Sequence, residues 1–369
     1  MTLGLSVSCF LVYRMSIVYT NKFLVYMFVG ILYSFWVIKI KYRAIVLCNT
    51  AIKRLAMNTS FIEKQSQLID ELKNISTEGQ NQETLNIDLL DATGVLEKIN
   101  AEDEKVASIV KGIIPQIAKA VDHVVQAFSK GGRLIYIGAG TSGRLGVLDA
   151  AECPPTFSVS DQQVIGIIAG GEKAIQKAVE GAEDSEIFAI DDLKAVDLSA
   201  NDVLVGIAAS GRTPYVISAM NYGKTVGATV VGISCSYNEK FDQANDINLC
   251  AIVGAEALTG STRMKSGTAQ KLILNMLSTA SMIRSGKSYK NLMIDVNASN
   301  EKLYARAVRI VMQATDCDYD CAKQALDSAK NNAKLATLMI LTGLSVEQAR
   351  ASLIDNNGFL RKAVEQTKN

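Results

Sequence analysis

One stretch decides the fold: residues 133–144 read RLIYIGAGTSGR. Its first part, Arg133–Ile137, is a short apolar run, which is typical of a buried strand. A loop rich in glycine and hydroxyl groups follows at Gly138–Gly143, and a helical pattern continues over Arg144–Ala151. A strand, a glycine-rich loop and a helix in this order predict the first unit of an α/β sheet.

The same alternation continues along the chain. Four more short runs rich in Val and Ile follow: Val164–Ala169, Val203–Ala208, Thr229–Ser234 and Ile247–Val253. Helical patterns lie between most of them, at Lys173–Glu180 and Thr213–Gly223. Continuous apolar strands alternating with helices predict a mostly parallel five-stranded sheet covered on both faces. Ligands of such sheets bind beyond the carboxyl ends of the strands.

Helical segments flank the predicted sheet on both sides. Before it, helical spacing covers Phe61–Asn74, Asp91–Ile99 and Glu104–Ser129. After it come Lys265–Ser285, Glu301–Ala314, Tyr319–Ser328, Asn332–Leu341, Ser345–Asn356 and Phe359–Thr367. Ser345 and Gln348 have the spacing of a capping box. We expect amino-terminal helices over 57–118, an α/β domain over 119–285 and an all-helical domain over 286–369.

The first 56 residues differ from the rest in composition. They hold seven basic residues, no acid and ten of the 23 aromatic residues, whereas 57–369 carries 31 basic and 37 acidic residues. The uncharged run Phe23–Ile38 is slightly short for a membrane span, which needs roughly 17–25 residues. One interpretation is upstream sequence translated from a wrong start, with Met57 as the true start. The other is a membrane anchor, whose basic flank would leave the remainder in the cytoplasm. Both interpretations put the rest of the chain in the cytoplasm.

Composition excludes several function classes. The net charge of +1 provides no basic footprint for nucleic acid. Seven scattered cysteines include no CxxC, so they indicate buried thiols in a reducing compartment. His123 is the only histidine and lies in a helical run, which excludes any site that needs two imidazoles. Proton transfer must therefore fall to Glu, Asp, Lys, Tyr or Cys.

Three loops at predicted strand ends are rich in glycine and hydroxyl groups: Gly138–Arg144, Ala209–Pro214 and Thr259–Thr268. The first satisfies GxGxxG, but the next strand is followed by two glycines, and Glu172 is the first acid, so the dinucleotide fingerprint fails. Backbone N–H groups and hydroxyls at a helix N-terminus bind a phosphate monoester. The three loops predict a small phosphorylated ligand, although well-capped helices would give the same pattern.

Two acidic positions are candidates for proton transfer. Glu152 lies in DAAECPP (149–155), where two prolines are expected to stop the helix and hold the carboxyl among Ala, Cys and Pro. Such a carboxyl is a candidate general acid, although glutamates at helix ends are commonly solvated. Cys153 beside it favours a buried small hydrophobe over a nucleophile. The acidic cluster 180–184 is either a solvated helix end or part of the site.

At these residues the chain resembles the N-acetylmuramic acid 6-phosphate etherases, a family with the sugar isomerase (SIS) fold that is related to glucokinase regulatory protein. The resemblance runs from about residue 70 to the C-terminus, over the blocks 77–79, 138–156, 178–184, 206–215, 260–271, 275–279 and 286–296. Two departures are Gln80, where an arginine is usual, and Ser236-Tyr237-Asn238, where Asn-Pro-Gly is usual.

The resemblance implies a fold and an activity. The fold would be an SIS-type αβα sandwich with a small carboxyl-terminal helical domain like a ubiquitin-associated (UBA) unit. The activity would be removal of D-lactate from the C3 ether of an amino-sugar phosphate, in a homodimer, with no metal and no cofactor. Glu152 matches the family's acid position, and Glu183 its second acid/base position.

The resemblance also guides the choice of binding residues. For the substrate phosphate we expect Gly140, Thr141, Ser142, Ser210, Gly211 and Thr213. For further substrate contacts we expect Glu78, Arg144, Arg212, Glu256, Ser261 and Lys265. Two other functions stay open: a non-catalytic sugar-phosphate sensor, and an aldose–ketose isomerase on the same fold. The presence of both Glu152 and Glu183 counts against a sensor, and the Glu-Cys-Pro-Pro block favours the etherase over the isomerase.

Overall fold

The computed structural model describes residues 22, 24–27, 29–43, 65, 75–296 and 301–368. The chain divides into two units, Met1–Glu71 and Leu72–Asn369. In the first unit, the helix Leu24–Arg43 has 20 residues and a mean hydropathy of 1.6, so it is long and apolar enough to cross a membrane. The apolar run was expected to be slightly short; the helix is longer because it continues through the basic residues after Ile38. The helix expected at Phe61–Asn74 lies outside the described residues.

The second unit contains the predicted sheet. Its strands are β1 (Leu134–Gly138), β2 (Val164–Ile168), β3 (Val203–Ile207), β4 (Thr229–Ser234) and β5 (Ile247–Cys250). They pair in parallel in the order β2-β1-β3-β4-β5. Leu134 lies opposite Val164 on one side and Val203 on the other, so β2, β1 and β3 begin in line. The five predicted strands are confirmed, and their carboxyl ends lie at one edge of the sheet.

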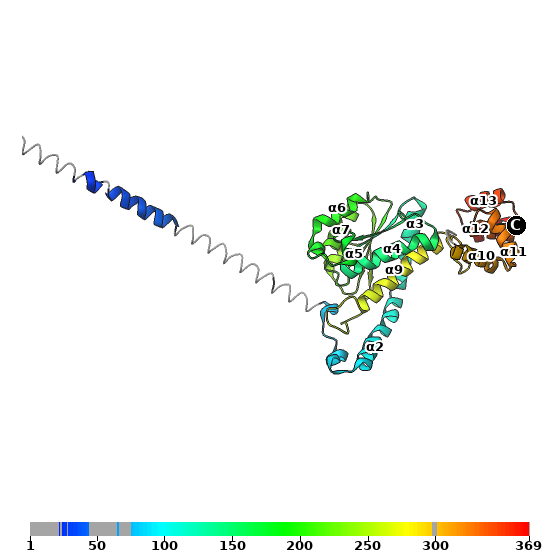
Figure 1. The fold of residues 1–369 in the computed structure, drawn as a ribbon, viewed down its shortest axis with the longest axis horizontal. Coiled ribbons are helices and arrows are strands. Elements are labelled where there is room, and N and C mark those ends of the chain that lie inside the picture. The colour runs from blue at the N-terminus through cyan, green and yellow to red at the C-terminus, as the bar shows by residue number, and fades with distance from the viewer. Residues whose placement is uncertain are drawn as a thin grey trace, which may run out of the picture. The chain divides into compact units, whose positions relative to one another are not determined.

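Helices cover both faces of the sheet (Figure 1). One face carries α2 (Ala92–Lys111), α3 (Ile114–Ser129), α4 (Gly140–Phe157) and α9 (Lys265–Arg284), and the other carries α6 (Glu186–Ala195) and α7 (Pro214–Val226). Side chains alternate along each strand, so Tyr136 packs into the core under α4 and α9, while its neighbours Ile135 and Ile137 pack under α6 and α7. Each face therefore has its own apolar core, as in a doubly wound fold.

Two local expectations were wrong, and some helices were not predicted. Helix α4 continues through Pro154 and Pro155 to Phe157, where they were expected to stop it. Because both prolines lie in the last two turns, they remove only two hydrogen bonds, and the helix ends at Ser158 in the left-handed conformation (φ 48°). The helix expected at Lys173–Glu180 is only α5 (Lys173–Gln176), and neither α6 nor α8 (Glu239–Gln243) was predicted.

The carboxyl-terminal part is all helical, as predicted. It comprises α10 (Glu301–Thr315), α11 (Tyr319–Ser328), α12 (Ala333–Thr342), α13 (Val346–Asp355) and α14 (Leu360–Lys368). These helices pack around a separate apolar core, which Tyr289 and Ile294 of the preceding segment also join. The capping box is present, since Ser345 Oγ accepts from Gln348 N and Gln348 Oε1 accepts from Ser345 N.

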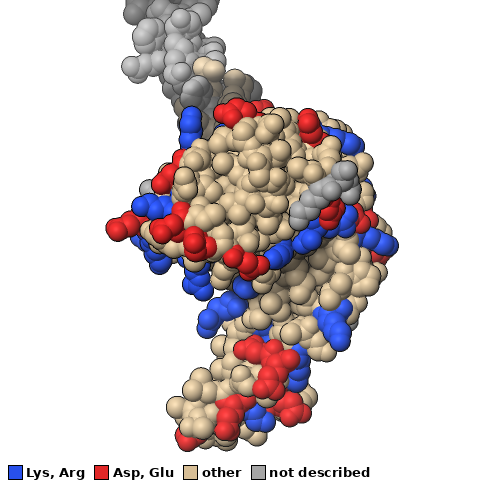
Figure 2. All heavy atoms as spheres, turned by 90° about the vertical axis from the view of Figure 1, so that its right-hand side faces the viewer, with Lys and Arg blue, Asp and Glu red and all other residues tan. Residues whose placement is uncertain are grey.

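The charged side chains are mixed in sign. On the face in Figure 2, Lys and Arg alternate with Asp and Glu around a broad uncharged area. No continuous basic surface covers that face. This distribution agrees with the balanced composition of the chain.

Candidate functional site

The carboxyl edge of the sheet brings the first two hydroxyl-rich loops together. Strands β1 and β3 are neighbours, and Gly138 at the end of β1 lies opposite Ile207 at the end of β3. The chain leaves β1 for α4 on one face and leaves β3 for α7 on the other. Chain directions therefore diverge between these two strands, which is the position where open α/β sheets commonly bind ligands.

The first loop is built for close approach to a ligand. Gly140 has φ +54° and begins α4, so it takes a backbone conformation that favours glycine. A Cβ on Gly143 would lie 2.7 Å from the Gly138 carbonyl oxygen and 2.7 Å from Ile168 Cγ1, so only glycine lets α4 pack this close to the strands. The free N–H groups of this helix terminus can bind an anion.

Two hydroxyls of this loop differ in their surroundings. Ser142 is buried and its Oγ donates to Gln270 Oε1 of α9 at 2.9 Å, so this hydroxyl joins two helices. Thr141 is half-buried, and its Cγ2 lies 3.7 Å from the position of a Cβ built on Gly267. The start of α9, which forms the end of the third hydroxyl-rich segment, therefore lies beside the first loop.

The second loop turns sharply between β3 and α7. Gly211 has φ +67° and its N–H donates to the Ala208 carbonyl at 3.1 Å. The backbone N–H of Arg212 donates to Ser210 Oγ at 3.2 Å. Thr213 precedes α7, and its side chain makes no capping hydrogen bond. The loop places the hydroxyls of Ser210 and Thr213 at the same edge of the sheet as Gly140.

A cavity of about 180 Å³ opens beside the first loop. Its walls come from the first turns of α4, from the end of β2 and from the segment around η4 (Ala182–Asp184). The lining residues are Ala139, Gly140, Arg144, Ala169, Ala174, Ala178, Val179, Glu180, Gly181, Ala182 and Glu183. The structure thus brings Glu183 and Arg144 to the phosphate-type loop. The volume is below the roughly 300–1,000 Å³ of complete ligand sites, so the cavity suits one part of a larger ligand.

Glu152 does not line this cavity and lies farther along α4. It is exposed on α4, twelve residues after Gly140. At the helical rise this spacing corresponds to about 18 Å along the axis, which is beyond the reach of a glutamate side chain. Cys153 beside it is buried, and burial raises the pKa of its thiol to about 12, which agrees with its interpretation as a small hydrophobe.

A buried carboxylate one turn before Glu152 was missed by the sequence reasoning. Asp149 accepts hydrogen bonds from Tyr136 Oη at 2.9 Å, Asn275 Nδ2 at 2.9 Å and Ser278 Oγ at 3.2 Å. Burial raises the pKa of Asp149, and the three hydrogen bonds partly oppose that rise. The network fastens α4 to β1 and α9. Its only sequence signal is that both Asp149 and Asn275 fall within blocks of the family resemblance.

Two expected contact residues of the third loop are engaged within the protein. The fully buried Glu256 accepts from Lys265 N at 2.9 Å, and from Ser266 N and Oγ at 3.0 and 2.8 Å, so it caps the start of α9. The ammonium of Lys265 is buried and pairs with Glu102 of α2. These side chains hold the helix that carries the loop.

Two further expected contacts lie on or beside that loop. Glu78, in η1 (Ser76–Glu78), has its Oε2 3.3 Å from the position of a Cβ built on Gly260. Ser261 is half-buried in the same loop. A third carboxyl, Glu78, is therefore next to the predicted phosphate-binding loops, although it does not line the cavity beside Gly140.

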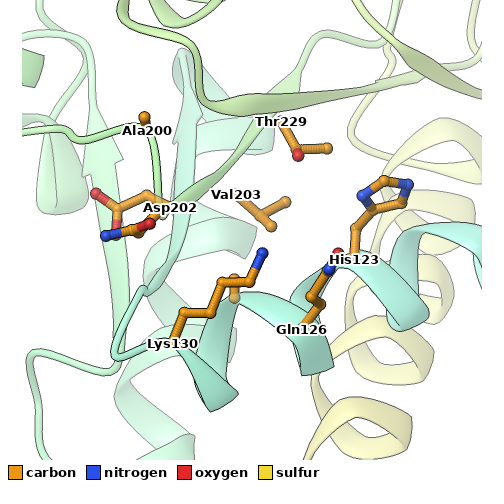
Figure 3. Close-up of a pocket in the computed structure, with 9 residues that line it drawn as sticks. His123, Gln126, Lys130, Ala200, Asp202, Val203 and Thr229 are labelled. Atoms are coloured by element: carbon orange, nitrogen blue, oxygen red, sulfur yellow. The ribbon is translucent and has the colours of Figure 1, made fainter.

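His123 takes no part in this edge. It lines a separate hollow of about 60 Å³ with Gln126, Lys130 and Thr229, at the amino ends of β3 and β4 (Figure 3). The hollow has room for a few water molecules and is too small for a sugar phosphate. Across the part of the chain that the structure describes, no three His, Cys, Asp or Glu side chains gather as metal ligands.

Comparison with known proteins places this geometry in a family. Residues 116–224 match the N-terminal SIS domain of glucokinase regulatory protein, residues 176–280 the SIS domain, and residues 290–334 the C-terminal lid domain of glucokinase regulatory protein. The chain is 72% identical over 302 residues to the N-acetylmuramic acid 6-phosphate etherase of Colwellia psychrerythraea, covering 82% of this chain and 98% of that relative. It is 60% identical, with the same coverage, to the etherase of Pseudoalteromonas atlantica. The chain therefore belongs to the N-acetylmuramic acid 6-phosphate etherase family.

Proposed function

We propose that this chain is a carbon–oxygen lyase that removes D-lactate from N-acetylmuramic acid 6-phosphate. The products are N-acetylglucosamine 6-phosphate and D-lactate, in the recycling of peptidoglycan amino sugars. The observation that carries the proposal is 72% identity over almost the whole of a named etherase. The cavity that joins Glu183 to the Gly140 loop supports it, because it places a carboxylate beside an anion-binding helix terminus.

The reaction needs one base and one acid. Opening of the sugar ring exposes the C1 aldehyde, which acidifies the proton on C2. Glu183 takes that proton, the C2–C3 double bond forms, and the C3–oxygen bond to lactate breaks. Glu152 gives a proton to the departing lactate oxygen. Water then adds at C3 and C2 regains a proton. Two carboxyl groups are sufficient for this chemistry, so we propose no metal and no cofactor.

The phosphate would hold the substrate while these steps occur. Its place is the N-terminus of α4, with backbone N–H groups from Gly140 and Thr141 and hydroxyls from Ser210 and Thr213. Ser142 would act by fixing the loop to α9, since its hydroxyl is bonded to Gln270. Arg212, Gly211, Glu78 and Ser261 remain candidates at the rim of this pocket.

The position of Glu152 on α4, away from the Gly140 loop, supports a shared site in a homodimer. Because Glu152 lies about 18 Å along α4 from Gly140, we propose that a second copy supplies it. The surface around Glu152 suits such a contact: Leu148 is 54% exposed and Met276 is 38% exposed. Leu148 lies one turn before Glu152 on α4, and Met276 lies on α9, which packs against α4. Exposed apolar side chains grouped in this way mark contact surfaces.

The test is turnover in heavy water by the full chain. We expect free D-lactate together with deuterium at C2 of the sugar product. Glu152→Ala should abolish lactate release, and Glu183→Ala should abolish exchange of the C2 proton. Lactate without the C2 label would exclude elimination followed by addition. Binding without turnover would favour the sensor, and ketose formation the isomerase.

Mixing the two variants tests the shared site. If the acid and the base come from different subunits, a mixed dimer holds one complete site, and an equal mixture regains about one quarter of wild-type activity. If both glutamates act within one chain, the mixture stays inactive.

A cytoplasmic location is proposed on the family's chemistry, and fractionation of cells that express the full chain would test it.

A further inference from the structure

The cavity beside Gly140 contains a single cationic side chain. Most of its wall is small and apolar, from five alanines and Val179, and its charged members are Arg144, Glu180 and Glu183. The wall therefore offers one positive group, two carboxylates and a patch that suits a methyl group. This combination is unlike a phosphate cradle, which uses backbone N–H groups and hydroxyls.

Arg144 is held in place by its own helix and by the next segment. Its Nε donates to the Ile175 carbonyl of α5 at 2.9 Å, which fixes the guanidinium plane. Within residues 75–296 and 301–368, no carboxylate forms an ion pair with Arg144. The two terminal nitrogens of the guanidinium are thus left for a ligand, and their fork matches the two oxygens of a carboxylate.

The substrate of the proposed reaction carries two anionic groups on different carbons. The 6-phosphate is one, and the carboxylate of the lactyl ether at C3 is the other. With the phosphate at the N-terminus of α4, the second anion needs a cation of its own. We propose that Arg144 binds the lactyl carboxylate, with the lactyl methyl group against the alanines and Val179 of the cavity. This inference rests on the proposed function and assigns the cavity to the leaving group.

The placement agrees with the proposed role of Glu183. Glu183 lines the same cavity as Arg144. The lactyl group is attached at C3, next to the C2 carbon whose proton Glu183 takes. Binding of the carboxylate by Arg144 would therefore hold the C2–C3 bond beside the base. It also provides selectivity, because a sugar phosphate without the lactyl arm leaves Arg144 unpaired.

The experiment compares two ligands that differ only in the lactyl group. Glu152→Ala is used as the background to prevent turnover, and calorimetry measures binding of N-acetylmuramic acid 6-phosphate and N-acetylglucosamine 6-phosphate. Adding Arg144→Met should weaken the first ligand by about 10- to 150-fold, as for loss of a hydrogen-bonded charge, and the second by less than about twofold. Arg144→Lys should recover part of the loss. Lys177→Met removes a neighbouring exposed charge outside the cavity and should change neither affinity.

Two other results of the affinity measurements would overturn the inference. Equal losses for both ligands would assign Arg144 to the phosphate or to the shape of the loop. Unchanged affinity for both would remove it from the site. A circular dichroism spectrum that matches the parent protein excludes unfolding as the cause of any loss. Failure of the proposed function is seen separately, as absence of lactate release by the wild-type chain, and the two affinities still test Arg144 in that case.

Discussion

Replacement of Glu102 by glutamine should destabilise the protein through the buried Lys265. The ion pair joins α2 to α9, and the side chains are only 4% and 3% exposed. Removal of one partner from a buried pair leaves an uncompensated charge and costs roughly 3–5 kcal/mol. Because a glutamine oxygen still accepts a hydrogen bond from Lys265, we expect about 3 kcal/mol, the low end of that range. For a unit of this size the melting temperature should fall by about 5 °C.

Denaturant unfolding, followed by far-ultraviolet circular dichroism, measures this loss. The matched control is Lys105→Gln, which removes the other partner of Glu102 at 2.5 Å; its side chain is 53% exposed. Loss of that exposed pair should cost less than about 1 kcal/mol. The double variant Glu102→Leu, Lys265→Met should recover most of the stability, because no charge is then left in the core.

The pH dependence gives an independent check. Burial would raise the pKa of Glu102, but the hydrogen bonds and charges of Lys105 and Lys265 hold it below the ordinary value. A lowered pKa in the folded state contributes stability above the unfolded pKa, and this contribution is lost as pH falls through the folded value. The difference between wild type and Glu102→Gln should therefore shrink on acidification. Two results would refute the reasoning. One is an unchanged unfolding free energy for Glu102→Gln. The other is a double variant that is no more stable than Glu102→Leu alone or Lys265→Met alone.

Four other substitutions should have measurable effects. Gly143→Ala should weaken phosphate binding and stability together, because its Cβ would lie 2.7 Å from the Gly138 carbonyl oxygen; calorimetry and melting curves check this. Asp149→Ala should cost at least about 3 kcal/mol by leaving three donors unpaired, of which Tyr136 Oη and Ser278 Oγ are buried and Asn275 Nδ2 is half-buried. Since burial raises the pKa of Asp149, the wild type gains stability relative to this variant as the pH falls through the raised folded-state pKa towards the ordinary carboxyl value. Glu256→Gln should loosen the start of α9, seen as faster amide exchange there. Ser345→Ala should cost about 1 kcal/mol in denaturant unfolding through loss of the capping box.

The sheet could be predicted because of where its strands lie. A parallel strand covered on both faces needs apolar side chains at every position, so all five residues of β3 are buried and the run is visible in the sequence. Helix α6 has no such signal. Ile187 and Phe188 are exposed, and only Ala189 and Leu193 are buried, so no apolar stripe repeats along it.

Only part of the site could be predicted from the sequence. The helix spacing alone separates Glu152 from the Gly140 loop, so the distance between them could have been anticipated. The approach of Glu183 to Gly140 depends on how β1 and β2 pair, which no local pattern contains. The expected contacts Glu256 and Lys265 instead hold α9, because a polar residue in or beside a loop serves equally well to support that loop or to touch a ligand.

Substitutions at the two edges of the parallel sheet should have different effects. At the amino edge, short turns precede the strands, and Arg133 clamps Asp202 through Nε–Oδ1 at 3.1 Å and Nη2–Oδ2 at 2.8 Å. Substitutions there alter how firmly neighbouring strands hold together. Substitutions in the loops at the opposite edge alter which molecule is held. A lineage built on this framework can thus exchange one set of loops for a new substrate while the other edge keeps the protein folded.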